Sequence, residues 1–190
     1  MKRINSLVLI VCTLLVFSCK EATKKETTTK VQPTQVNQKG QSAVVDKDSS
    51  PNALQVAMSM DDFKTLVVAV KAAGVEDALV NAGPLTVFAP VNSAFDKLPE
   101  GTVASLLKPE NKSKLAYILK NHVAPANYKV KTLEKNVRKG RKLYMASGKY
   151  LEVTKKGEDL YVGGVKILKS VKVSNGWVHV IGDILVPSEK

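Results

Sequence analysis

The sequence predicts an α+β domain, with helices in its first half and strands in its second. Between residues 51 and 122, hydrophobic side chains recur at helical spacing. After Pro125 the spacing changes to two, and short apolar runs are separated by turns that contain glycine. Because the helices come first and the strands last, the order argues against an alternating, doubly wound parallel sheet.

The first predicted helix is amphipathic and ends at Gly74. Its apolar face consists of Phe63, Leu66, Val67 and Val70, with Asp61 or Ser59 as the expected cap. The other elements expected in this half are a helical turn over 75–80, a strand over 85–89 that ends at Pro90, a small helix capped by Asn92 or Ser93 that runs to Leu98, a second over 102–107, and a longer helix from Pro109.

Strands are expected at 142–145, 150–154, 160–162, 165–173 and 177–186. The dipeptide Asn175-Gly176 predicts a type I′ hairpin between the last two, since both central residues of that turn need a positive φ. This half of the domain is therefore expected to consist of strands separated by short turns.

The N-terminus has the features of a bacterial lipoprotein signal. Lys2 and Arg3 precede an apolar run over 7–17, which is shorter than the 20 or so residues that span a bilayer. The run ends in VFSC (residues 16–19), which resembles a lipobox and implies cleavage after residue 18 and acylation of Cys19. Cys12 would be removed with the signal, so acylation would also leave no free thiol. The alternative is an ordinary secretory signal in which Cys19 has no role.

Residues 19–50 are predicted to be a flexible tether that holds a domain at 51–188. The tether is rich in Thr, Lys, Glu and Gln and has no hydrophobic period, so it cannot bury enough apolar surface to fold. The whole chain carries a net charge of +12, which suits acidic partners. Nucleic acid is not among those expected, because aromatic residues make up only 5% of the chain and no basic stripe accompanies them.

Three segments of the domain resemble the fasciclin-like family. They read GPLTVFAPVNSAFDKLP (83–99), LKNHVAP (119–125) and NGWVHVIGDILVP (175–187), and they occur in the family's order. The resemblance implies a β-wedge of about seven strands flanked by helices, an extracellular or periplasmic location, adhesion as the function and no catalysis. From the resemblance together with the lipoprotein signal, we expect an outer-membrane-anchored lipoprotein that faces the periplasm or the exterior, and we expect a monomer.

The chain departs from the family pattern at several positions. Asn121 replaces the tyrosine of the central Tyr-His pair, Ala126 replaces a glycine, and Ser170 and Lys172 lie where an acidic residue is common. Asp183-Ile184 matches in letters a pair that animal members use for integrin contacts. A bacterial lipoprotein would rarely meet integrins, so only a general partner-contact role is assigned to these two residues and to Trp177.

No constellation for catalysis or for a metal site is found in the sequence. His122 shares an apolar helical face with Leu115, Ile118 and Leu119, and His179 shares a strand face with Trp177, so both histidines are interpreted as structural. The domain has no Gly-x-Ser-x-Gly motif, and two distant histidines without a cysteine are a poor zinc site. We therefore expect neither an enzyme nor a cofactor.

The densest basic region runs from Lys129 to Lys142, where seven cations accompany the single carboxylate of Glu134. One interpretation is a solvated loop and strand edge protected by lysines. The other is a docking patch for anionic glycans or lipid headgroups, centred on Arg138, Lys139 and Arg141.

Three functions compete. The first is a cell-surface or periplasmic adhesion module for glycans or matrix proteins. The second is a carrier of an apolar small molecule such as a carotenoid, with a groove near Trp177 or Tyr144. The third, a hydrolase, is disfavoured by the lack of a nucleophile motif.

Overall fold

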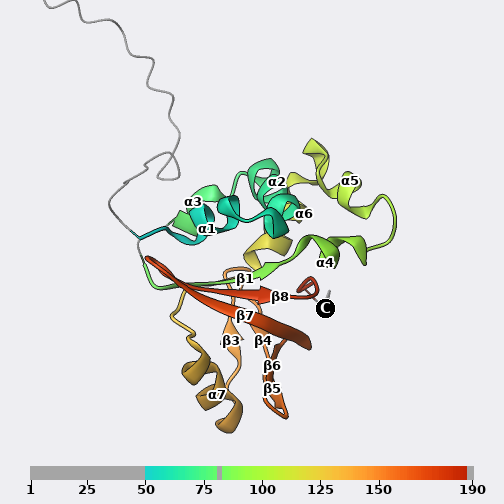
Figure 1. Ribbon diagram of the computed structural model, residues 1–190. Coiled ribbons are helices and arrows are strands. Elements are labelled where there is room, and N and C mark those ends of the chain that lie inside the picture. The colour runs from blue at the N-terminus through green and yellow to red at the C-terminus, as the bar shows by residue number, and fades with distance from the viewer. Residues whose placement is uncertain (1–49, 81–82, 188–190) are drawn as a thin grey trace, which may run out of the picture. The chain divides into compact units, whose positions relative to one another are not determined.

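The computed structural model describes residues 50–80 and 83–187 (Figure 1). Within them the chain is an α+β domain, which confirms the predicted fold class. The predicted signal (1–18), Cys19 and all of the tether up to residue 49 lie outside the described residues. The helices and 3₁₀ turns are α1 (Ala53–Ser59), η2 (Asp61–Phe63), α2 (Lys64–Ala73), α3 (Glu76–Val80), α4 (Asn92–Asp96), α5 (Thr102–Leu106), η3 (Pro109–Asn111), α6 (Lys112–Lys120) and α7 (Val130–Arg138).

The strands of the described residues form one sheet of six and one of two. The larger sheet has the order β2-β1-β8-β7-β6-β5, and the smaller pairs β3 with β4. All neighbours are antiparallel except β1 and β8, which are parallel and pair from Leu85 with Gly176 to Pro90 with Ile181. The strands are β1 (Leu85–Pro90), β2 (Val123–Ala124), β3 (Leu143–Tyr144), β4 (Tyr150–Leu151), β5 (Val153–Lys156), β6 (Asp159–Val162), β7 (Val165–Val173) and β8 (Gly176–Ile181).

Strands β1 and β8 separate two hydrophobic cores. Successive side chains of a strand point to opposite faces of its sheet. Val87 and Val178 therefore pack with helices α1–α3 and α6. Phe88 and Ile181 point the other way and pack with α7 and with strands β3, β5 and β6. Figure 1 shows this division, with α1–α6 on one side of β1 and β8 and with α7 and β3–β6 on the other. Both faces of β1 are covered, which explains why all six of its residues are buried.

The predicted helix caps were wrong. Helix α2 ends at Gly74 as expected, but 3₁₀ turn η2 precedes it, and neither Asp61 nor Ser59 caps it with a side chain. The main-chain N–H of Thr65 instead donates to Oδ1 of Asn92, 3.0 Å away. Asn92 is the first residue of α4 and does not cap that helix. It stabilises α2, because it satisfies one of the N–H groups that a helix N-terminus leaves unpaired.

Two helices were not predicted. Helix α1 begins with a capping box, in which Asn52 and Gln55 bond each other's main-chain N–H groups at 2.9 Å. Helix α7 corrects the interpretation of residues 129–142 as a loop and strand edge. Its Leu133 is fully buried, so three of the basic residues of this region, Lys131, Lys135 and Arg138, lie on a helix that is packed on the second core.

The strand half follows the prediction except at three places. Strand β7 has the expected bounds, but the run over 150–154 is split into β4 and β5, and β8 stops at Ile181, well before residue 186. The hairpin before β8 is shifted, because Val173 pairs with Gly176 and the loop residues are Ser174 and Asn175. Gly176 is thus the first strand residue and not a central turn residue.

Candidate functional site

Two adjacent buried side chains, Asn121 and His122, hold the main chain of the C-terminal segment (residues 182–187). Nδ2 of Asn121 donates to the carbonyl oxygen of Leu185 at 2.8 Å, and the N–H of Leu185 donates to Nε2 of His122 at 2.9 Å. The hydroxyl of Ser147 donates to Oδ1 of Asn121 at 2.8 Å. Since this segment follows the last strand, these side-chain bonds replace strand pairing at Leu185.

The bonds of His122 define its tautomer. Because Nε2 accepts a hydrogen bond, the hydrogen of the neutral ring is on Nδ1, which donates to the carbonyl oxygen of Ile118 at 2.9 Å. Burial lowers the pKa of His122 from 6.5 to about 4, against a smaller opposing effect of the bond to Ile118. The ring lies just beyond α6, which ends at Lys120, and not on the helical face where it was predicted.

His179 is also buried with both nitrogens engaged. Nε2 donates to the carbonyl oxygen of Tyr128 at 2.7 Å, and the hydroxyl of Ser170 donates to Nδ1 at 2.7 Å. Its ring stacks on Phe88 and on Trp177, with centroids 5.3 and 6.4 Å away. Burial lowers the pKa of His179, and the bond to Tyr128 opposes this effect. Neither histidine offers a free nitrogen for proton transfer or for a metal.

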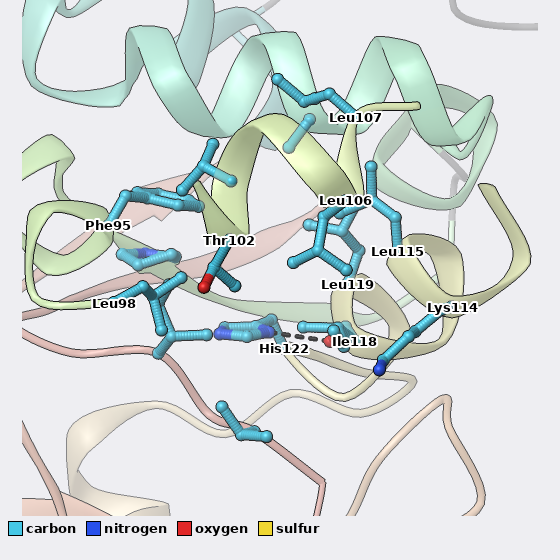
Figure 2. A pocket seen from close by; sticks show the side chains of 15 residues that line it. Phe95, Leu98, Thr102, Leu106, Leu107, Lys114, Leu115, Ile118, Leu119 and His122 are labelled. Carbon is cyan, nitrogen blue, oxygen red and sulfur yellow. Dashed lines mark hydrogen bonds between the residues drawn. The ribbon is translucent and has the colours of Figure 1, made fainter. Parts of the chain in front are cut away.

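An apolar pocket of about 260 Å³ lies between the short helices α4 and α5, helix α6 and the C-terminal segment (Figure 2). His122 lines it, and Ile184 and Val186 contribute from the C-terminal segment. The two other residues with polar groups are Thr102 and Lys114. The rest of the lining is Ala69, Pro90, Phe95, Leu98, Val103, Leu106, Leu107, Leu115, Ile118 and Leu119.

The apolar groove predicted near Trp177 or Tyr144 is not found there, so that prediction was wrong. The hollow beside Trp177 is lined mainly by turn residues and by polar residues such as Asn127 and Lys172. Tyr144 is 46% exposed and its ring lies 5.3 Å from that of Tyr150 on the β3–β4 hairpin. The signal for the true pocket was the density of large apolar residues in the short helices over 92–107, which is more than helices of that length can bury among themselves.

The basic residues of helix α7 form one exposed surface. Lys131, Lys135 and Arg138 recur at i, i+4 and i+7 and are exposed, and Lys139 and Arg141 continue the surface beyond the helix. We call these five residues the basic face. The single carboxylate of the region, on Glu134, lies 3.1 Å from Nζ of Lys155 on β5. It is therefore already engaged outside the basic face.

The other predicted partner-contact residues do not join the basic face. Trp177 is half-buried near the start of β8, and Asp183 follows the other end of that strand. The carboxylate of Asp183 lies 3.6 Å from Nζ of Lys97, and Ile184 lines the apolar pocket. Arg138, Lys139 and Arg141 lie together on α7 and the turn after it. The six residues are thus distributed over at least three places.

Among the described residues, no group of three or more His, Cys, Asp or Glu side chains is arranged to hold a metal ion. In the same part of the chain, no helix combines the length and the apolar character needed to cross a membrane.

The three segments of family resemblance meet in space. Strand β1 pairs with β8, the main-chain N–H of Phe88 donates to the carbonyl oxygen of His122 at 2.8 Å, and His122 in turn holds Leu185. The family model of the fasciclin domain matches residues 61–187. This chain belongs to the fasciclin family.

Relatives of this fasciclin domain occur in bacteria and animals. Protein sll1483 of Synechocystis is 42% identical over 149 residues, which are 77% of this chain and 81% of that protein. The transforming growth factor-beta-induced protein ig-h3 of Sus scrofa is 34% identical over 139 residues, 72% of this chain but only 19% of that much longer protein.

A solved structure shows the same fold. It is a domain pair from the insect cell adhesion molecule fasciclin I, which matches with a TM-score of 0.66 at 19% sequence identity. The match covers 72% of this chain and 51% of the other. The match thus shows a shared fold over most of the chain.

Proposed function

We propose that this chain is an exported, lipid-anchored binding or adhesion module of the cell envelope, which docks anionic glycans on its basic face. The fasciclin domain supports the general role, since relatives with this domain include a cell adhesion molecule. The observation that carries the finer proposal is the basic face itself. Its five cations are exposed, and the two carboxylates beside it are engaged by other lysines, that of Glu134 by Lys155 and that of Glu152 by Lys142.

The shape of the basic face suits a polyanion. A helix places side chains at i, i+4 and i+7 in a row, with a rise of about 1.5 Å per residue, so the three cations of α7 extend over roughly 10 Å. A linear chain of uronate or sulfate groups can follow such a row. Binding of this kind is screened by salt, because the Debye length falls from about 10 Å at 0.1 M to about 3 Å at 1 M.

We expect reversal of charge at Arg138→Glu, Lys139→Glu and Arg141→Glu to raise the Kd for immobilised alginate at least about tenfold at 0.1 M salt. Each basic group near an anionic surface contributes about 1 kcal/mol of binding free energy. Three reversals therefore remove more binding free energy than a tenfold rise in Kd requires. Surface plasmon resonance measures the effect. The matched control makes the same change of charge at three exposed lysines of the helical half, Lys108, Lys112 and Lys120. Equal losses in both triple variants would show that only net charge matters and that the basic face is no site.

The proposed anchor is an acylated Cys19. We expect labelled palmitate to be incorporated into the expressed chain and to be lost entirely in Cys19→Ser, because the thiol is the proposed attachment point. In-gel fluorescence, after an alkyne-labelled palmitate is coupled to a fluorophore, measures the incorporation. The matched control is Cys12→Ser, which lies within the proposed signal and is expected to keep the label. A wild-type chain that stays unlabelled while its signal is processed would contradict the anchor.

A second candidate function is that of a carrier for an apolar small molecule. The observation that favours it is the apolar pocket, which is lined almost entirely by side chains without polar groups. Small-molecule sites have this character, with a few polar groups that orient the ligand.

A further inference from the structure

The apolar pocket adjoins a polar hollow. The hollow is lined by Glu100, Gly101, Thr102, Ser105, Leu106, Asn111 and Lys114. Three of these residues, Thr102, Leu106 and Lys114, also line the apolar pocket. An apolar space and a polar space that share a boundary match a ligand with an apolar tail and a polar head.

The volume of the pocket favours a single hydrocarbon chain. Pockets for drug-sized ligands measure about 300–1,000 Å³, so 260 Å³ is below that range. Since a group the size of a water molecule takes up about 30 Å³, the pocket holds roughly eight to ten carbons. A chain of this length, or the end of a longer one, fills the space between α5, α6 and the C-terminal segment.

The charges at the boundary indicate the sign of the head. His122 is neutral and both its nitrogens are bonded, so Lys114 is the one residue with a formal charge among the described residues that line the apolar pocket. The carboxylate of Glu100 lines the outer hollow but not the pocket. Lys114 is exposed, and it makes no ion pair with any residue that the structure describes. Its stem borders the apolar wall while its ammonium group can stay in water.

Figure 2 shows the two polar side chains of the boundary. Thr102 from α5 and Lys114 from α6 lie on either side of the apolar group that includes Leu106 and Leu119. A head group beside Lys114 is thus near a cation, and the tail meets mostly apolar side chains, with the hydrogen-bonded ring of His122 among them.

We propose that the pocket binds a single-chain amphiphile with a carboxylate head, such as a medium-chain fatty acid, with the tail inside and the carboxylate at Lys114. This inference rests on the second candidate function, that of an apolar carrier, and names its ligand class. It is independent of the basic face, which lies on the other side of β1 and β8.

The test is calorimetric titration of the full-length chain, carrying Cys19→Ser so that no acyl group of its own competes, with decanoate and with decan-1-ol at pH 7.5. We expect decanoate to bind about fivefold more tightly than the alcohol. Lys114→Met keeps most of the apolar stem and removes the charge, and it is expected to abolish this preference, so that the variant binds acid and alcohol with equal affinity. A partly exposed ion pair of this kind is worth about a factor of five at most.

A second pair of variants locates the tail. Val103→Trp places an indole in the pocket from a half-exposed position of α5 and is expected to abolish binding of both ligands. Ala104→Trp adds the same group at the next position, which is exposed and does not line the pocket, and is expected to leave binding intact. Circular dichroism checks that both variants fold.

The outcomes separate the two ideas. Equal binding of acid and alcohol, unchanged in Lys114→Met but lost in Val103→Trp, overturns the carboxylate assignment and leaves the carrier function standing. Binding that survives Val103→Trp places the ligand elsewhere and overturns the inference. If neither ligand binds, the inference and the carrier function both fail.

Discussion

Gly176→Ala is expected to destabilise the domain by at least about 4 kcal/mol, which is exceptional for a single substitution. A Cβ at this position would overlap the carbonyl oxygen of Leu85 and lie 2.7 Å from its carbonyl carbon. The φ of 148° also lies in a region that side chains rarely adopt. To relieve this overlap, β1 would have to move away from β8. That movement would disturb the pair of strands that separates the two cores. A loss of this size corresponds to a fall in Tm of roughly 15 °C for a domain of this length.

Urea unfolding followed by the fluorescence of Trp177, the chain's single tryptophan, measures the effect. Gly148→Ala is the matched control, since Gly148 also has a positive φ, 81°, but nothing within 4 Å of the added carbon. Its expected cost is that of the backbone conformation alone, about 1–2 kcal/mol. Similar losses in both variants would mean that conformation and not the approach of β1 requires glycine at 176.

The position of Gly176 also shows where local sequence rules stop. Asn175-Gly176 predicted a turn between two strands, and a turn is present, but one residue earlier. The reason is tertiary, because Leu85 lies against Gly176 and the side chain of Asn175 reaches the N–H of Ala53 and the carbonyl oxygen of Leu79. Strand β7 could be predicted to the residue, since its apolar alternation and its flanking glycine turn are local.

The two unpredicted helices, α1 and α7, each had a helix signal in the sequence that neighbouring residues obscured. Helix α7 carries Leu133 and Val137 at helical spacing, but the surrounding lysines predicted a solvated loop. Helix α1 begins with an Asn-x-x-Gln capping box that precedes a short apolar run. Asn92 is different, because no local rule can assign it to a helix that begins 28 positions earlier. The apolar residues over 92–107 were a signal for the pocket, but its shape could not be predicted, since its walls come from segments that only the fold brings together.

The clamp formed by Asn121 and His122 connects the core to the pocket. Leu185 is held by both side chains, and its neighbours Ile184 and Val186 line the pocket. In place of the tyrosine expected from the family pattern, Asn121 contributes an amide that donates to a main-chain carbonyl group. Whatever weakens this clamp therefore loosens one wall of the pocket as well as the domain.

Acidification is expected to lower the free energy of unfolding between pH 6.5 and pH 4, by about 3 kcal/mol from His122 alone. The folded state holds the pKa of His122 below its unfolded value, so in this window the unfolded chain binds the additional proton. Stability is thus fully present above pH 6.5 and is lost as the pH falls to about 4. A proton on Nε2 would also face the N–H of Leu185, so two donors would oppose each other. The lowered pKa of His179 acts in the same direction.

The slope of stability against pH isolates the contribution of His122. Near pH 5, a histidine that is neutral in the fold contributes about 1.4 kcal/mol per pH unit. His122→Gln keeps an acceptor for Leu185 and removes the titration, so we expect its slope near pH 5 to be smaller by about that amount, as measured by urea unfolding at several pH values. The carboxylates are the same in the wild type and in His122→Gln, so their contribution cancels in the difference between the two slopes. Because the chain has only two histidines, NMR can follow both imidazoles directly. A His122 signal that titrates near pH 6.5 in the folded protein, or a slope unchanged in His122→Gln, would show that this ring is not held neutral by burial.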